Sequence, residues 1–382
     1  MKICKHFGNC GGCSFQNIPY LQQLKNKEEK LKKLLSYYEI DSSFKPINSY
    51  REWFYRNKME FTFSFQEKII LGLHHKNKKR KVVDIEECLI ASQDTEKILN
   101  CVKKFADKKN YPVYHKFTHR GFLRHLIIRE AKFTNQIMIG IVTTPLQDLD
   151  KEKFINDLLN LKLEKKLKSI WWIINDALSD AVVFQKKELL WGDCFIQEEL
   201  GEYKFNIGID SFFQVNSFGI KDLYEKITDY TCLTGKEKVL DLYCGVGCIG
   251  IFLSKKAKFV WGIELKKEIV EAASENAKLN KIENISFLTD EVRRFLNLKG
   301  SFYRGIDLVV INPPRCGLSK KVIRAILRLE PKMIIYSSCN PDTFCRDLKA
   351  LNSLYKINFI EPFDFFPHTI HLECLALLDK IS

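Results

Sequence analysis

A cysteine near the carboxyl end of the chain stands between an apolar run and a helical pattern. The run "KMIIYSS" predicts a buried strand, and Asn340 followed by Pro341 is typical of a helix start. Cys339 lies between them, where the positive end of the helix dipole favours a thiolate. Cysteine is also among the most frequently buried residue types. Position alone therefore leaves two interpretations of Cys339, a nucleophile or a small packing residue.

A second set of cysteines opens the chain. Cys4, Cys10 and Cys13 have the spacing C-x5-C-x2-C, and the glycines between them let the backbone wrap around a metal centre. Closure of such a site requires a fourth ligand, for which Cys88 in "VVDIEECLIAS" is the best candidate. Zinc and a [4Fe-4S] cluster both accept four thiolates. The spacing leaves zinc, a cluster and free reduced thiols as open alternatives.

The segment "DLYCGVG" (241–247) follows an apolar run and opens a helical pattern. Gly245 and Gly247 let the backbone turn tightly and approach a ligand, as in nucleotide-binding turns. Glu264 ends the next predicted strand, where a carboxylate can accept hydrogen bonds from ribose hydroxyls, and Asp290 follows the third strand, beside the expected adenine. The pattern is not G-x-G-x-x-G; it resembles the S-adenosylmethionine site of class I methyltransferases. A plain sheet turn is the alternative.

Two patterns of secondary structure surround these residues. From about residue 215 onward, apolar runs alternate with helical spacing, which predicts a doubly wound, mainly parallel sheet. Residues 50–210 are instead rich in aromatic, strand-like runs, with a helix expected at 150–166. Residues 20–38 predict an amphipathic helix with a basic outer face.

We therefore expect an α/β chain with a Rossmann-like methyltransferase domain and a β-rich domain before it. The expected divisions are 1–90, with the cysteine segment and the start of the β-rich domain, 91–210, with the rest of that domain, and 211–382, the catalytic domain.

Composition restricts the class of protein. The chain has 382 residues and a formal charge of +14, from 61 basic and 47 acidic residues, which suits a polyanionic partner or a solvated lysine-rich surface. No apolar stretch approaches the ~20 residues needed to span a bilayer, and no signal peptide opens the chain. We expect a cytoplasmic protein, in which 13 cysteines are more than structure alone requires.

Two further motifs complete a set of reactive groups. Asn312 and Arg315 belong to "INPPRCG", which follows the fourth strand of the predicted sheet. Cys339 also follows a strand of this sheet, so we expect the two segments to lie at the same edge. Glu373 ends "FDFFPHTIHLE"; its neighbours His368 and His371 also allow a metal-binding reading. A thiolate adding to C6 of uracil makes C5 nucleophilic enough to accept a methyl group, and a base must then remove the C5 proton. Cys339 and Glu373 are the candidates for these two roles.

At this point the sequence closely resembles the RNA 5-methyluridine (uracil-C5) methyltransferase family. The resemblance covers almost the whole chain in the family's order, through the segments "CKHFGNCGGCSFQ", "YRNKMEFTF", "SFFQVN", "DLYCGVG", "GIE", "NPPRCG", "YSSCNP" and "FPHTIHLE".

The resemblance implies a role for each matching residue. It implies S-adenosylmethionine contacts by Gln214, Tyr243, Glu264 and Asn312, although some members have Asp where this chain has Asn312. It implies that Cys339 is the nucleophile, that Glu373 is the base, and that a [4Fe-4S] cluster binds to the four cysteines.

The resemblance also implies a substrate. The layout is most similar to the single-site 23S rRNA branch, called RumB-type, and we expect a monomer that lacks the family's frequent β-barrel RNA-binding module. We then expect RNA contacts from Tyr55, Arg56 and Lys58 and from the basic run 74–81. The alternatives are a tRNA uracil-C5 methyltransferase, an amino-methyltransferase suggested by "NPP", and a non-catalytic iron–sulfur RNA-binding protein.

Overall fold

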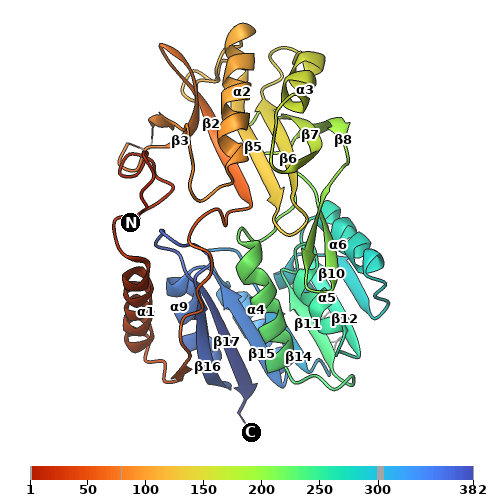
Figure 1. Ribbon diagram of the computed structural model, residues 1–382. Helices are drawn as coiled ribbons and strands as arrows, with labels where there is room; N and C mark the ends of the chain where they lie inside the picture. The colour runs from red at the N-terminus through yellow and green to blue at the C-terminus, as the bar shows by residue number, and fades with distance from the viewer. Residues whose placement is uncertain (1, 79, 299–304, 382) are drawn as a thin grey trace.

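The chain forms two units, each built around its own sheet (Figure 1). The structure is a computed structural model and describes residues 2–78, 80–298 and 305–381. The lower unit in Figure 1 carries most of the second half of the chain, and the upper unit carries residues from the first half. In these ranges, no helix has the length and apolar character that crossing a bilayer requires.

The lower unit contains an eight-stranded sheet in the order β1-β16-β17-β15-β14-β11-β12-β13. Neighbouring strands from β15 to β13 in this order are parallel, whereas β17 is antiparallel to both β15 and β16. This arrangement confirms the expected doubly wound, mostly parallel sheet. The strands are β1 (Ser43–Phe44), β11 (Lys238–Leu242), β12 (Phe259–Glu264), β13 (Ile285–Thr289), β14 (Leu308–Ile311), β15 (Met333–Ser338), β16 (Tyr355–Phe363) and β17 (Glu373–Lys380).

Helices cover both faces of this sheet, as the alternation of strand and helix patterns requires. One face shares a core with α4 (Ser217–Tyr230), α5 (Cys248–Ser254) and α6 (Lys267–Leu279). The other face shares a second core with α1 (Tyr20–Tyr37), α7 (Val292–Leu298), α8 (Lys320–Leu329) and α9 (Pro341–Leu351). The carboxyl ends of the parallel strands therefore remain available for ligands at one edge.

The upper unit contains a seven-stranded sheet in the order β4-β3-β2-β5-β6-β7-β8, antiparallel except between β6 and β7. Helices α2 (Asp94–Lys108) and α3 (Lys151–Leu159) pack on one face of it. The strands are β2 (Lys58–Gln66), β3 (Lys68–His74), β4 (Val82–Asp84), β5 (Leu123–Ala131), β6 (Gln136–Thr143), β7 (Lys166–Ile174) and β8 (Lys186–Gly192).

The sequence interpretation of this unit needs three corrections. Helix α2 was not expected, α3 ends at Leu159 rather than near residue 166, and the run 180–185 is not a strand. The apolar residues of α2 recur at helical spacing, and Ile98, Leu99 and Val102 are fully buried. The sequence of this segment therefore carries the periodicity that predicts an amphipathic helix.

A hairpin of β9 (Ile196–Leu200) and β10 (Tyr203–Ile207) joins the two units. Ile196 and Phe205 of this hairpin share one core with Ile127 of the upper sheet and with Phe252 of α5. The core is therefore continuous between the units, and the chain between residues 207 and 217 leaves the hairpin at their junction. The three domain divisions expected from the sequence stay a prediction.

Helix α1 departs from its expected amphipathic pattern at two positions, Leu21 and Lys27. Leu24, Leu31 and Leu35 are buried as expected, whereas Leu21 is exposed. Lys27, expected on a solvated basic face, is buried, and its Nζ lies 2.7 Å from Asp364 Oδ1 and donates to the Phe366 carbonyl at 3.0 Å. This ion pair ties the N-terminal helix to the segment between β16 and β17. The prediction of a basic outer face is therefore wrong at Lys27, because this lysine pairs with a buried carboxylate from a distant segment.

We predict that Lys27→Met lowers stability by about 3–5 kcal/mol, because it leaves the carboxylate of Asp364 buried without its charged partner. The measurement is the unfolding midpoint in denaturant. Lys25→Met is the matched control, since Lys25 lies on the exposed face of the same helix. Equal stability of the two variants would contradict the stated role of the ion pair.

Candidate active site

Cys339 lies where the sequence predicts, between strand β15 and helix α9. Asn340 caps the helix by accepting a hydrogen bond from the Asp342 backbone N–H at 3.2 Å, and Pro341 occupies the first turn. The Cys339 side chain is half-buried. In contrast, Cys345 and Cys374 are fully buried packing residues, so neither competes with Cys339 for contact with a substrate.

Glu373 begins β17, which runs antiparallel to β15 and pairs Cys374 with Ser338. The ladder therefore brings Glu373 beside Cys339, the residue after Ser338. Ser337 Oγ donates a hydrogen bond of 2.6 Å to Glu373 Oε1. Glu373 Oε2 is buried and has no hydrogen-bond partner among the described residues. One carboxylate oxygen thus fixes the side chain, and the other is free to accept a proton.

Burial changes the acidity of both groups. Desolvation raises the pKa of Glu373 to about 7, while the Ser337 hydrogen bond and the charge of Arg315 oppose the rise. Desolvation and the Glu373 carboxylate raise the pKa of the Cys339 thiol above its usual range, again opposed by Arg315. Burial therefore opposes the effect that the helix start and the neighbouring guanidinium have on this thiol, and the expected thiolate stays a prediction.

Arg315 is a site residue whose role the sequence interpretation missed. The sequence places it in "INPPRCG" but assigns it no function. In the structure, the Asn340 side-chain N–H₂ donates to the Arg315 carbonyl at 3.0 Å, which holds its loop against the start of α9. The positive charge of the Arg315 side chain acts to lower the pKa of both Cys339 and Glu373.

The glycine turn follows β11 and has the backbone that a close approach to a ligand requires. Tyr243, Gly245 and Gly247 have φ angles of 62°, 54° and 85°, in the left-handed region where glycine is favoured. Glu264, at the end of β12, accepts a hydrogen bond from the Gly245 N–H at 3.3 Å. The tip of this turn and the Glu264 carboxylate are therefore neighbours, as the sequence pattern predicts.

The remaining predicted cofactor residues lie around the same edge of the sheet. Asp290 follows β13, is buried, and accepts a hydrogen bond from Arg294 Nε at 2.5 Å. Asn312 follows β14, and its N–H donates to the Leu242 carbonyl at 3.4 Å. Gln214 lies in the segment between the hairpin and α4, and its carbonyl accepts a hydrogen bond from the Asn57 side chain at 2.8 Å.

Asp241, near the end of β11, was also missed. It is fully buried, accepts a hydrogen bond from the Gly250 N–H at 3.0 Å, and has a pKa raised to about 7, chiefly by desolvation. An acidic residue inside an otherwise apolar strand is the sequence signal that could have found it. Its contact fixes the first turn of α5 against the strand and so shapes the glycine turn between them.

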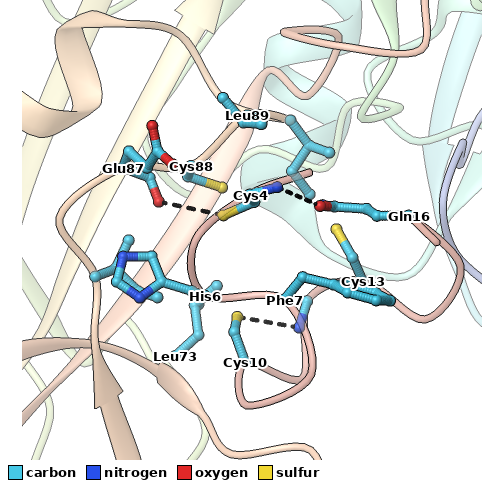
Figure 2. Close-up of a pocket in the computed structure, with 13 residues that line it drawn as sticks. Cys4, His6, Phe7, Cys10, Cys13, Gln16, Leu73, Glu87, Cys88 and Leu89 are labelled. Carbon is cyan, nitrogen blue, oxygen red and sulfur yellow. Dashed lines mark hydrogen bonds between the residues drawn. The ribbon is translucent and has the colours of Figure 1, made fainter. Parts of the chain in front are cut away.

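The four predicted cysteine ligands border one cavity (Figure 2). Cys4, Cys10 and Cys13 come from the N-terminal segment, and Cys88 comes from the segment before α2. Cys10 Sγ accepts a hydrogen bond from the Gly12 N–H at 3.3 Å, and the Gln16 side chain accepts one from the Cys4 N–H at 2.8 Å. The fold therefore brings the distant Cys88 to the three thiols of the N-terminal segment.

Among the described residues, no group of three or more Cys, His, Asp or Glu side chains is arranged to hold a metal ion. This finding covers the cysteine cavity, where the sulfurs are not gathered around one point, and it covers the pattern of His368, His371 and Glu373. His368 instead stacks on Trp53 with 4.0 Å between the ring centroids. A donor set of four thiols still has the composition that a [4Fe-4S] cluster uses, in which each thiolate binds a different iron.

One of the expected RNA contacts, that of Tyr55, is corrected by burial, whereas the contact expected of Lys58 stays a prediction. Tyr55 is fully buried, so its ring cannot stack on a base, and its hydroxyl donates to the Pro367 carbonyl at 3.1 Å. Lys58 is half-buried and pairs with Glu60 at 2.7 Å. The basic run 74–81 lies between β3 and β4, and its Lys79 falls outside the described residues.

Comparisons with known proteins agree with this architecture. The family described as tRNA (Uracil-5-)-methyltransferase matches residues 19–381. An uncharacterized RNA methyltransferase of Caldanaerobacter subterraneus is 40% identical over 99% of this chain and 84% of its own length. The tRNA (uracil(54)-C(5))-methyltransferase of Pyrococcus horikoshii is 35% identical over 98% of this chain and 85% of its own length.

A solved structure extends the likeness to the fold. The crystal structure of the Pyrococcus abyssi tRNA (uracil-54, C5)-methyltransferase in complex with S-adenosyl-L-homocysteine superposes with a TM-score of 0.78 and 31% identity. The match covers 96% of this chain and 85% of that chain. With the site geometry above, these matches show that the chain belongs to the tRNA (uracil-5-)-methyltransferase family of S-adenosylmethionine-dependent RNA-modifying enzymes.

Proposed function

We propose that the protein methylates C5 of a uridine in RNA, with Cys339 as the nucleophile and Glu373 as the base. The observation that carries the proposal is the antiparallel pairing of β15 with β17, which sets a half-buried thiol beside a buried carboxylate with one free oxygen. The amino-methylation alternative has no use for this pair, because an exocyclic amine needs no covalent activation. A non-catalytic protein has no use for it either.

The residues act in a fixed order. Cys339 Sγ, once deprotonated, forms a bond to C6 of uracil, and the C5–C6 electron pair moves toward the C4 carbonyl as an enolate. S-adenosylmethionine, when bound, supplies an electrophilic methyl group to C5. Glu373 Oε2 then takes the C5 proton, the C5–C6 double bond forms again, and the S–C6 bond breaks to return the Cys339 thiolate. The Arg315 charge favours the anionic form of the thiol in the first step and of the carboxylate in the last.

The proposed cofactor pocket follows the same edge of the sheet. Glu264 would accept hydrogen bonds from the ribose hydroxyls, and Asp290 would lie beside the adenine. Tyr243, Gly245, Gln214 and Asn312 would line the rest of the pocket. The proximity of Gly245 to Glu264, and the placement of Asp290 and Asn312 directly after β13 and β14, support this assignment.

The target RNA is 23S rRNA or tRNA. The sequence resemblance favours 23S rRNA, whereas the Pyrococcus relatives named for a defined substrate act on uracil 54 of tRNA. Methylation assays with separate 23S rRNA and tRNA transcripts, followed by mapping of 5-methyluridine, decide between them.

We predict different failures for the two proposed catalytic variants. Cys339→Ala should neither methylate RNA nor trap it, because no adduct forms at C6. Glu373→Gln should transfer one methyl group and then stall as a covalent protein–RNA adduct, because an amide cannot take the C5 proton. A denaturing gel with labelled methyl groups measures both outcomes. Formation of 5-methyluridine by Cys339→Ala, or wild-type turnover by Glu373→Gln, would show that the mechanism is wrong.

We also propose that Cys4, Cys10, Cys13 and Cys88 hold a [4Fe-4S] cluster with a structural role. The support is the four thiols around one cavity, drawn from two segments of the chain that the centre would join. The cavity lies at the junction of the N-terminal segment with the upper unit, and the proposed catalytic pair is built from other cysteine and carboxylate groups.

We predict that anaerobically purified protein contains about four irons per chain and absorbs visible light. Cys88→Ser should lose both the iron and the absorbance. Cys101→Ser is the matched control, because Cys101 belongs to the same unit but borders a different pocket, between α2 and α3. Stoichiometric zinc in colourless protein, or full iron retention in Cys88→Ser, would overturn the assignment.

RNA contacts are proposed for the basic run 74–81 together with the neighbouring loop 114–120. Phe117 at this loop is 58% exposed, and the Arg80 guanidinium lies 5.0 Å from its ring centroid. The loop has a defined backbone, since the His115 N–H donates to the Arg120 carbonyl and the His119 N–H donates to the His115 carbonyl. A fixed aromatic ring flanked by basic side chains suits stacking on an unpaired base beside a phosphate.

We predict that Phe117→Ala weakens RNA binding by roughly 1–3 kcal/mol with little change in its salt dependence, because stacking is lost and charge is kept. Arg80→Ala should instead reduce the salt dependence. Phe65→Ala is the control, because Phe65 is 66% exposed and has no cation over its ring among the described residues. Fluorescence titrations at several salt concentrations measure all three. Equal affinities of Phe117→Ala and Phe65→Ala would remove the loop from the proposed interface.

A further inference from the structure

The segment from 364 to 372, which joins β16 to β17, leads directly into Glu373. It has no regular secondary structure, and its turn is closed by bonds from the Thr369 N–H and hydroxyl to the Phe366 carbonyl. His368 within it has a φ of 64°, a conformation that side-chain-bearing residues rarely adopt. Tertiary contacts must therefore hold this turn, and two groups of residues from the first quarter of the chain supply them.

The first group of contacts, here called the first arm, comes from the N-terminal residues Ser14, Phe15 and Gln23. The N–H groups of Ser14 and Phe15 both donate to the His368 carbonyl, at 2.7 and 3.1 Å. Gln23 of α1 adds to this arm, since its side-chain oxygen accepts the His368 N–H at 3.0 Å and its Nε2 lies 3.1 Å from His368 Nδ1. The backbone and the ring of His368 are thus both fixed by the N-terminal segment.

The second arm comes from residues 53–56. Tyr55 donates its hydroxyl hydrogen bond to the Pro367 carbonyl, and Trp53 stacks on the His368 ring. This short segment is itself held by the two residues after Cys88, because the Phe54 and Arg56 N–H groups donate to the carbonyls of residues 89 and 90, at 2.8 and 2.9 Å. Both arms therefore begin next to cysteines that border the cavity of Figure 2.

We infer that Tyr55, Trp53, Gln23 and the Ser14–Phe15 backbone are positioning residues for Glu373. They hold the Pro367–His368 turn, and through it the start of β17, so that Glu373 Oε2 meets the C5 proton of the covalent adduct. The inference rests on the proposed roles of Cys339 and Glu373. It links an ordered cysteine cavity to the removal of the proton, the last step of the reaction, and leaves methyl transfer unaffected.

The test compares two tyrosine variants of matched chemistry. Tyr55→Phe removes only the hydroxyl that holds the Pro367 carbonyl. Tyr355→Phe is the control, because Tyr355 is also fully buried and donates to a proline carbonyl, that of Pro331, at 2.9 Å, on a different part of the fold. Trp53→Phe is a second variant of the same arm and is expected to act in the same direction as Tyr55→Phe.

The readout is the fraction of RNA held as a methylated covalent adduct during turnover. We expect Tyr55→Phe to raise this fraction and to lower kcat by roughly 2- to 10-fold, the effect of one lost hydrogen bond, with wild-type affinity for S-adenosylmethionine. Tyr355→Phe should match the wild type in both. RNA that carries 5-fluorouridine at the target should trap all four proteins at equal rates, since that adduct forms without removal of a proton.

The outcomes separate the inference from the proposed function. If the wild type does not trap 5-fluorouridine RNA, the covalent mechanism itself fails. If the wild type traps it but Tyr55→Phe and Trp53→Phe accumulate no more adduct on ordinary RNA than Tyr355→Phe does, the positioning role is wrong. A slower trapping rate in the two arm variants would overturn it as well, because that result marks a general disturbance of the site.

Discussion

The buried carboxylate of Glu373 is the constraint around which the proposed active site is arranged. A carboxylate without solvent is costly in its charged form, and among the residues that the structure describes only Ser337 donates a hydrogen bond to it. Desolvation therefore brings its pKa to about 7, where the group can be ionised before the reaction and can hold a proton after it. A carboxylate in water, with a pKa near 4, would be a much weaker base.

The same burial acts on Cys339 in the opposite functional sense. Desolvation and the nearby carboxylate raise the pKa of the Cys339 thiol, the proposed nucleophile. Arg315 is the neighbouring charge that opposes this effect, and it also opposes the rise in the pKa of Glu373. One exposed guanidinium thus favours the anionic form of both groups. Its loop is fastened to the start of α9 through the Asn340 side chain.

Long-range contacts decide where this carboxylate lies. The sheet fixes Glu373 from one side through the register of β17 with β15 and β16. On the other side, the turn at Pro367 and His368 is fixed by the N-terminal segment and by residues 53–56, and Lys27 neutralises Asp364 beside it. Residues from the beginning of the chain therefore hold the turn that leads into the proposed base.

The local features of this protein could be predicted from its sequence. It was sufficient for the doubly wound sheet, the helix start after Cys339 and the glycine turn before α5, because hydrophobic period, capping residues and glycine conformations are encoded by neighbours in the chain. The spacing of the cysteines also predicted a set of four ligands, and all four line the cavity of Figure 2. The family resemblance rested on the same local motifs.

Three features follow from tertiary packing alone. They are the burial of Lys27 and Tyr55, the raised pKa of Cys339, and the contacts that two N-terminal segments make with the turn before Glu373. Residues 14 and 368, or 55 and 367, are separated by most of the chain, and no local periodicity records such a pairing. A lysine or tyrosine has the same local pattern whether it faces water or a buried partner. Its environment depends on which distant segment packs against it, and for this reason the contacts around the proposed base are seen only in the folded protein.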